Sequence, residues 1–170
     1  DWGHQIDELW AGLPGVELAA VADEAEEGLA QAVARHNLPA AAGFRDWQKM
    51  LAEVKPDIVA ICMRDIDCHA EMAIAAAAAG AKGIFMEKPF VPTLAAADAV
   101  IKACTRSNTK LAIAFVNRHS PAYATARDLI EDGRIGKVLE LRGRGKEDKR
   151  GGGQDLWVLG CHVLDMMADI

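Results

Sequence analysis

Short apolar runs that recur between helical segments constrain the fold of this chain more than any other feature. Residues 56–63, 83–87 and 110–116 are almost continuously apolar, and helical patterns at 67–80 and 93–108 separate them. Strands that are apolar on both faces are typical of parallel sheets, because helices cover such a sheet on both sides. The pattern therefore predicts a doubly wound α/β domain with a parallel sheet.

The same alternation is present earlier in the chain. Residues 15–23 predict a strand with an acidic end, and residues 24–37 predict an amphipathic helix. Acidic residues occupy the first turn of that helix, where the helix dipole favours them. Residues 44–54 predict a further helix, and Thr93 is the expected N-cap of the helix at 93–108.

The pattern changes near Asn117, which marks the predicted end of the first domain at residues 1–117. Residues 120–136 predict a helix with a glycine-marked end, and residues 137–147 then alternate strictly between the two faces of a strand. Such alternation is typical of a half-solvated strand in an antiparallel sheet. We therefore expect residues 118–170 to be the beginning of a second, truncated domain.

Composition excludes several classes of protein. Hydrophobic residues make up 51% of the 170 residues, enough for a substantial core, and the net charge of -6 argues against nucleic acid as the main partner. No apolar run approaches the ~20 residues that a membrane span needs. The chain starts at Asp1 and not at a methionine, which is compatible with the removal of a signal segment.

The four cysteines, Cys62, Cys68, Cys104 and Cys161, form no C-x-x-C pair. This spacing favours reduced thiols over a disulfide framework or a zinc site, so we expect a cytoplasmic protein without a metal.

The carboxyl ends of the predicted strands carry the candidate binding residues, because ligands of open α/β sheets bind beyond that edge. An acid at the end of the first strand, Asp23, is suited to accept hydrogen bonds from ribose hydroxyls, although capping of the next helix explains it equally well. The residues at this edge are Asp23, Met63, Arg64, Glu87, Lys88, Asn117 and Arg118.

Glu87 and Lys88 stand side by side where a buried strand ends, and Pro89 prevents its continuation. A lysine at this edge is able to hold a substrate hydroxyl or to transfer a proton. On the local pattern alone, a solvated salt-bridging pair is the simpler interpretation.

The stretch "GGGQDLWVLGCHVLD" at 151–165 predicts a helix after a glycine turn. Asp155 and His162 share one face of a regular helix, and Asp165 lies three residues beyond His162. A histidine is a natural proton acceptor near neutral pH. The simpler alternatives are that Asp155 caps the helix and that His162 is a core residue.

Taken in order, these motifs resemble the Gfo/Idh/MocA oxidoreductases. The resemblance rests on the strand-end acid, "KPDIVAIC" before a helix with His69, "MEKPF", "NRHSPAYATARDLIEDGRIGKV" and "GCHVLD". It implies a Rossmann domain followed by an α+β domain with a mostly antiparallel sheet, which builds a homo-oligomer. It also implies an NAD(P)-dependent enzyme that acts on CH-OH groups of sugar-like or cyclitol-like substrates.

The resemblance also implies roles for individual residues. Lys88 is expected to contact the reacting hydroxyl, and His162 is the expected acid/base, with Asp155 as a further catalytic candidate. NAD is expected in preference to NADP, because the charge of Asp23 opposes a 2′-phosphate. The expected cofactor contacts are Asp23, Met63, Arg64, His69, Glu87, Lys88 and Asn117.

Two positions depart from the family pattern. Val158 stands where many members carry an aspartate one turn before the histidine, and Arg64 and Asp65 replace a common Pro-Asn pair. The first strand, the glycine loop and most of the second domain are also absent, so we expect a fragment.

Three functions are compatible with the sequence. The first is an NAD-dependent dehydrogenase of a sugar, polyol or cyclitol. The second is an enzyme that retains NAD and cleaves glycosidic bonds through transient oxidation and elimination. The third is a non-catalytic NAD-binding protein, which Val158 in place of the aspartate would suit.

Overall fold

The computed structural model describes residues 6–10, 12–145 and 156–170 of the chain. It divides into two compact units, residues 1–113 and 114–170. The second unit therefore begins shortly before the boundary at Asn117 that the sequence predicts. Each unit is described by itself below.

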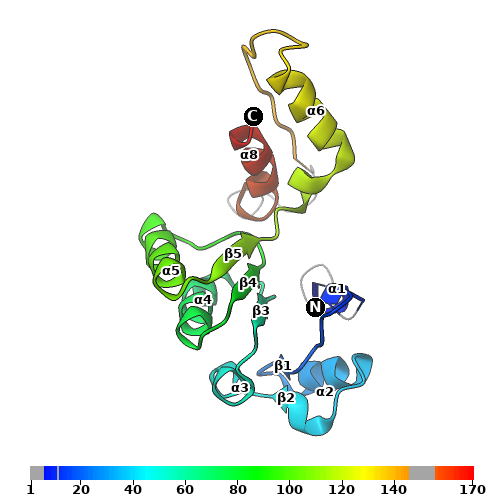
Figure 1. Cartoon of the computed structure of the whole chain (residues 1–170), viewed down its shortest axis with the longest axis vertical. Coiled ribbons are helices and arrows are strands. Elements are labelled where there is room, and N and C mark those ends of the chain that lie inside the picture. The colour runs from blue at the N-terminus through cyan, green and yellow to red at the C-terminus, as the bar shows by residue number, and fades with distance from the viewer. Residues whose placement is uncertain (1–5, 11, 146–155) are drawn as a thin grey trace. The chain divides into compact units, whose positions relative to one another are not determined.

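The described residues of the first unit form five short strands in two parallel sheets (Figure 1). In the larger sheet, Ile58 is in register with Gly83, and Gly83 with Lys110. The paired strands are parallel, and a helix lies between each two consecutive strands of the chain, which confirms the doubly wound α/β fold. The smaller sheet pairs β1 (Val21–Ala22) with β2 (Gly43–Phe44), and the larger has the order β3 (Ile58–Ile61), β4 (Gly83–Met86), β5 (Lys110–Ile113).

The helices of this unit begin at residues that satisfy their first free N–H groups. Thr93 is the N-cap of α5 and accepts from the N–H of Ala96, as the sequence predicts. Asp46 caps α3 in the same way. The helices are α1 (Ile6–Trp10), α2 (Glu26–Arg35), α3 (Trp47–Val54), α4 (His69–Ala78) and α5 (Leu94–Ser107), with short turns η2 (Ala40–Ala42) and η3 (Ile66–Cys68).

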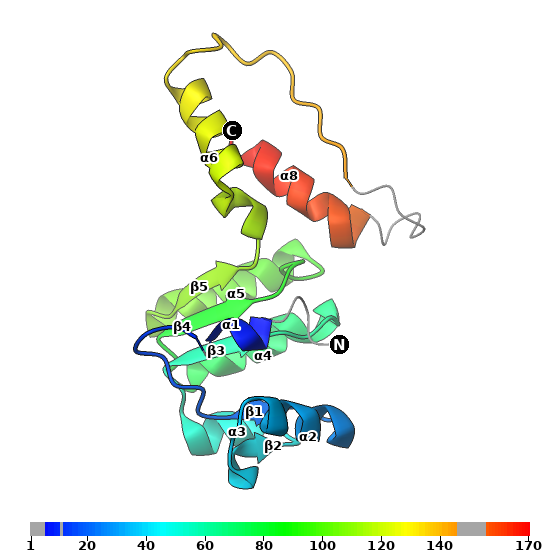
Figure 2. The same ribbon diagram turned by 90° about the vertical axis from the view of Figure 1, so that its right-hand side faces the viewer.

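The core of the first unit lies between the larger sheet and the helices α4 and α5, which run beside one another along it (Figure 2). Helix α4 contributes small side chains, and Ala73, Ala76 and Ala77 are all buried. Because alanine lets helix and strand backbones approach closely, Met86 of β4 and Val100 of α5 are completely enclosed.

The opposite face of the larger sheet departs from the prediction that helices cover both sides. Ile58 is 48% exposed and Ala60 is also exposed, although Val59 and Ile61 on the other face are buried. On the exposed side, Trp10 of α1 packs edge-on against Phe85 of β4 at 5.5 Å between ring centroids. Strand β3 is therefore apolar on both faces, but the described helices bury only one of them.

The second unit is helical in the described residues. Ser120 caps α6 by accepting from the N–H of Tyr123, and Gly133 and Gly136 adopt positive φ after the helix, where other residues would be strained. The unit contains η4 (Val116–His119), α6 (Pro121–Glu131), the π-helix η5 (Leu156–Gly160) and α8 (Cys161–Ala168).

The strand predicted at 137–147 is not observed over its described part, residues 137–145. Its strict alternation is correct for a strand, but a strand also needs a hydrogen-bonded neighbour. No described segment pairs with it. None of the described helices is long and apolar enough to cross a bilayer.

Candidate functional site

The carboxyl ends of β3 and β4 form the centre of the candidate site in the first unit. Met63 and Arg64 follow β3, and Glu87 and Lys88 follow β4, as the sequence predicts. Because the two strands are parallel neighbours, these residues come to the same edge of the sheet. Met63 is half-buried, whereas Arg64 is exposed.

Glu87 and Lys88 are buried, with 4% and 9% of their surfaces exposed. The Glu87 carboxylate accepts a hydrogen bond of 2.9 Å from the backbone N–H of Lys88. The following Lys88–Pro89 peptide bond is cis. The interpretation of this pair as a solvated salt bridge is therefore wrong, since an acid and an amine are both held inside the protein.

The ring of His69 contacts the residues that follow this pair and is completely buried. Its Nε2 lies 2.8 Å from the carbonyl oxygen of Met63, and its Nδ1 lies 3.0 Å from the carbonyl oxygens of Pro89 and Phe90. The prediction that His69 contacts the cofactor needs correction, because both ring nitrogens already contact backbone oxygens and the ring has no exposed surface. His69 instead joins the end of β3 to the turn after β4.

Asp23 follows β1, where the sequence places it. Its Oδ1 accepts a hydrogen bond of 2.9 Å from the N–H of Ala25, and Ala25, not Asp23, is the N-cap of α2. Its Oδ2 lies where a Cβ on Gly28 would approach to 2.5 Å, so a larger residue at position 28 would displace the carboxylate. The half-buried carboxylate thus lies over the first turn of α2, a place suited to an acid that binds ribose hydroxyls.

Arg45 supports this loop and was not expected from the sequence. Its guanidinium donates to the carbonyl oxygen of Glu24 at 2.6 and 3.2 Å and lies 3.9 Å from the Glu26 carboxylate. The position of Arg45 directly after β2 is a signal that sequence reasoning could have used, had the two-residue strand β2 been recognised.

A cavity of about 1000 Å³ opens between the two sheets of the first unit. Residues 15–24 line it from the side of β1, and residues 54–63 line it from the side of β3. Asp23 and Met63 are both among its lining residues. The cavity therefore connects the end of β1 with the end of β3.

The second unit carries the remaining predicted residues. His162 is half-buried on α8, and its ring packs edge-on against Phe115 at 6.0 Å. Asn117 lies in η4 and not at a strand end, because β5 already stops at Ile113. Asp155 lies outside the described residues.

The helix before His162 is not regular, contrary to the prediction. Residues 156–160 form a π-helix, and α-helical geometry begins only at Cys161. In a π-helix the hydrogen bonds join residues five apart, which rotates the preceding side chains relative to an α-helix. The spacing of a regular α-helix, which points to Val158, therefore does not determine which residue lies one turn before His162.

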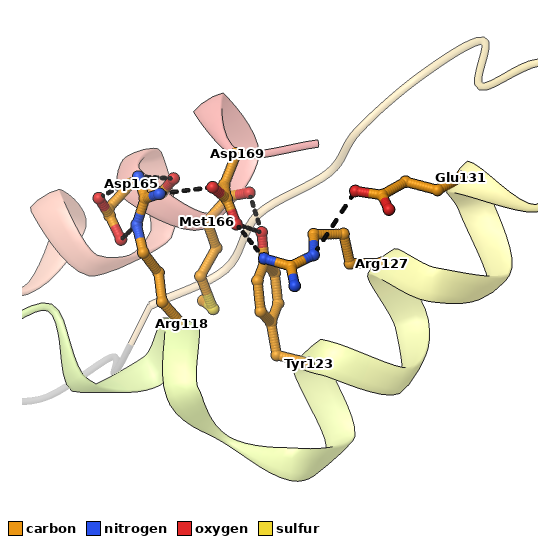
Figure 3. A network of polar contacts seen from close by, with 7 residues as sticks. All are labelled: Arg118, Tyr123, Arg127, Glu131, Asp165, Met166 and Asp169. Atoms are coloured by element: carbon orange, nitrogen blue, oxygen red, sulfur yellow. Dashed lines mark hydrogen bonds and ion pairs between the residues drawn. The ribbon is translucent and has the colours of Figure 1, made fainter.

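A network of charged side chains anchors α8 within the second unit (Figure 3). Arg118 donates two hydrogen bonds, of 2.7 and 2.6 Å, to the carboxylate of Asp165, and it also contacts Asp169. The hydroxyl of Tyr123 lies 3.0 Å from Asp169 and 2.9 Å from the carbonyl oxygen of Met166. Arg127 reaches the same Asp169 carboxylate at 3.4 Å.

These contacts shift the pKa values of the groups involved. The hydrogen bond from Tyr123, together with the charges of Arg118 and Arg127, lowers the pKa of Asp169. Burial and the neighbouring Asp169 raise the pKa of Tyr123, and the hydrogen bond with Asp165 raises that of Arg118. Asp165 thus serves to hold α8, a role that its spacing from His162 did not reveal.

All four cysteines are free thiols. Among the described residues, no three acidic, histidine or cysteine side chains lie together as a metal site would require. The chemistry of the described site thus comes from an acid at the end of β1 and a buried acid–amine pair at the end of β4.

Comparison with known proteins identifies related chains. Residues 4–115 match the model of the Gfo/Idh/MocA group, described as an oxidoreductase family with an NAD-binding Rossmann fold. A levoglucosan dehydrogenase from Pseudarthrobacter phenanthrenivorans is 35% identical over 139 residues, covering 79% of this chain and 34% of the relative. A scyllo-inositol 2-dehydrogenase (NAD(+)) from Bacillus subtilis is 32% identical over 143 residues, covering 82% and 40%.

Solved structures show the same fold. A scyllo-inositol dehydrogenase from Lactobacillus casei with bound NAD(H) and scyllo-inositol matches with a TM-score of 0.82 at 18% identity, covering 94% of this chain and 50% of that one. A putative myo-inositol dehydrogenase from Sinorhizobium meliloti matches with a TM-score of 0.65 at 29% identity, covering 77% and 38%. The chain spans less than half the length of the curated relatives named above.

Proposed function

This chain belongs to the Gfo/Idh/MocA oxidoreductase family, and from that premise we propose that it forms part of an NAD-dependent oxidoreductase. The reaction is hydride transfer between nicotinamide and a hydroxyl group of a sugar, polyol or cyclitol. The observation that carries this proposal is the buried Lys88 at the carboxyl end of β4. The two residues after it, Pro89 and Phe90, are held through their carbonyl oxygens by the ring of His69. The names of the relatives support the substrate class, since they include inositol and levoglucosan dehydrogenases.

The residues of the chain fit this chemistry in distinct ways. NAD, when bound, supplies the hydride acceptor. Lys88 is a compact cation with three donors, so it can orient the reacting hydroxyl and stabilise the oxygen as its proton leaves. His162 is the proposed proton acceptor in the second unit, because its imidazole suits proton transfer near neutral pH.

Asp23 is the proposed determinant of cofactor choice. One of its carboxylate oxygens is engaged by Ala25, and the other lies beside Gly28, where a ribose hydroxyl could donate to it. The charges of Asp23 and Glu24 oppose a 2′-phosphate. Arg45, a cation that could favour the phosphate, is engaged by the carbonyl oxygen of Glu24. We therefore propose NAD and not NADP.

The test of the function combines binding and turnover. Nicotinamide fluorescence should report tighter binding of NADH than of NADPH, and NAD with myo-inositol, scyllo-inositol or levoglucosan should yield NADH. Tightly retained NAD without net NADH formation would favour the glycoside-cleaving alternative. Cofactor binding without any turnover would favour a non-catalytic protein, and either outcome would overturn the proposed dehydrogenase.

A substitution at Asp23 tests the basis of cofactor choice. Asp23→Asn removes the charge but keeps an oxygen that can accept from the N–H of Ala25. The preference for NADH over NADPH should therefore fall while the melting temperature stays near that of the wild type. Asp65→Asn is the matched control, since Asp65 also accepts a local backbone N–H, from Asp67. An unchanged preference in Asp23→Asn would contradict the assignment.

We further propose that the whole protein is a cytoplasmic homo-oligomer. The family resemblance supports the oligomer, and the four free thiols support a reducing compartment. Light scattering of the purified protein and microscopy of a tagged protein test the two statements separately.

A further inference from the structure

We infer that His69 is a positioning residue whose doubly protonated ring holds the Lys88 turn against the end of β3. The inference concerns the ring's contacts and charge, and only its consequence for turnover rests on the proposed function. His69 is the first residue of α4, and it lies nineteen positions before Lys88 in the chain (88 − 69 = 19).

The protonation state follows from the partners of the ring. Nε2 faces the carbonyl oxygen of Met63 at 2.8 Å, and Nδ1 faces those of Pro89 and Phe90 at 3.0 Å. Carbonyl oxygens only accept hydrogen bonds, and a neutral imidazole carries a single N–H. Either neutral tautomer would therefore direct a nitrogen lone pair at a carbonyl oxygen. Only the imidazolium donates on both sides.

The complete burial of the ring also favours the doubly protonated form. His69 has no exposed surface, so solvent water does not relieve an unfavourable contact between two acceptors. A buried cation is tolerated when its donors are satisfied, and here three carbonyl oxygens surround the two N–H groups. Hydrogen bonds from a charged donor are also the stronger kind.

The charged groups near the ring act in both directions. The dipole of α4 disfavours a cation at the first residue of the helix, and Lys88 adds a like charge on the adjoining turn. Glu87, which is 4% exposed, brings a carboxylate to that turn. The other ionisable side chains on the flanking segments are Arg64, Asp65, Asp67, Cys68 and Glu71.

The consequence is a fixed backbone on the carboxyl side of Lys88. Pro89 and Phe90 directly follow the lysine, and their carbonyl groups are the ones that His69 binds. Met63, two residues after the end of β3, brings the third carbonyl. Loss of the ring would leave the N–H of Glu87 bound to the carbonyl of Ile61 but would free the carbonyl groups of Pro89 and Phe90, so the position of the lysine would be less well defined. Misplacing a reacting group by roughly 1 Å can lower a rate by about 10²-fold.

The first experiment is ¹⁵N NMR of the chain labelled at histidine. Both ring nitrogens of His69 should carry a slowly exchanging proton at neutral pH, and both signals should vanish in His69→Gln. A single protonated ring nitrogen would overturn the inference. This readout needs neither cofactor nor substrate, so it stands even if the proposed function fails.

The second experiment separates positioning from folding. In a turnover-competent protein, His69→Gln should lower kcat by about 10²-fold and leave the Kd for NADH nearly unchanged, because Asp23 is remote in sequence and untouched. The control is His119→Gln, an exposed histidine of η4, which should leave both values unchanged. An unchanged kcat in His69→Gln would overturn the positioning role, even with two ring protons present in the wild type.

Discussion

At the scale of single residues, burial distinguishes Lys88 from the other lysines that the structure describes. Lys82, at the opposite end of β4, is exposed and forms an ion pair of 2.7 Å with Asp57, which raises its pKa. Such surface pairs contribute little to stability. Lys88 is 9% exposed at the edge where ligands of parallel sheets bind. The two residues therefore form a natural pair for comparison.

Lys88→Met in the turnover-competent protein should abolish most of the activity. Methionine keeps the length and apolar stem but removes the charge and the donors, so kcat should fall by about 10²-fold or more. NADH affinity should change little, because the adenosine half is assigned to Asp23. Lys82→Met should leave kcat unchanged. Steady-state kinetics and fluorescence titration measure both, and a Lys88→Met enzyme with more than about a tenth of wild-type kcat would contradict the assignment.

The sequence predicts where these residues lie better than it predicts what surrounds them. The place of Lys88 follows from local order, since an apolar run ends directly before Glu87 and Pro89 follows. Its burial and the clamp by His69 depend on Met63, Pro89 and Phe90, which come from two different segments. Local patterns do not encode such contacts, so the resemblance suggested a cofactor contact for His69 instead.

At the scale of elements, α4 and α5 were predicted well because their signals are local. Thr93 caps α5, and its apolar positions recur with helical spacing. The strand at 137–147 was predicted on equally good alternation but is absent from residues 137–145. A helix makes its own hydrogen bonds, whereas a strand depends on a partner elsewhere in the chain.

The close packing of α4 predicts a position-specific response to added volume. Ala76 has no exposed surface, whereas Ala78, half a turn further, is exposed. Ala76→Leu should lower the free energy of unfolding by about 1–3 kcal/mol, because three added carbon atoms have no space in the core. Ala78→Leu should remain within about 0.5 kcal/mol of the wild type. Chemical denaturation compares the two, and equal stability would contradict the packing described for α4.

The network around α8 predicts acid sensitivity. Because the folded state lowers the pKa of Asp169, this group stabilises the fold above its unfolded pKa of about 3.9. That contribution is lost as the pH falls through about 4 towards the folded pKa. The melting temperature of the second unit should therefore fall as the pH is lowered through this range. In Asp169→Asn the melting temperature should depend less on pH over the same range. If the dependence of the melting temperature on acid pH is the same in Asp169→Asn as in the wild type, other carboxylates dominate acid unfolding.

At the scale of the molecule, the described strands of the first unit follow the order of a Rossmann fold, and one place in that order is filled by none of them. In the order 3-2-1-4-5-6, β2 and β1 take the first two places, and β3, β4 and β5 take the last three. The remaining central place falls between β1 and β3. The cavity of about 1000 Å³ lies there, lined by residues 15–24 and 54–63.

This arrangement predicts a contrast between neighbouring amides of β3. The carbonyl of Ile61 accepts from the N–H of Glu87, which follows β4, so alternate residues of β3 point their backbone groups towards β4 and the others towards the cavity. Val59 and Ile61 belong to the first set, and Ile58 and Ala60 to the second. In the 170-residue chain, hydrogen exchange should be slow at Val59 and Ile61 and much faster at Ile58 and Ala60. Equal protection at all four amides would mean that another strand already occupies the cavity. The predicted contrast would instead show that this edge of β3 is free to pair with a further strand.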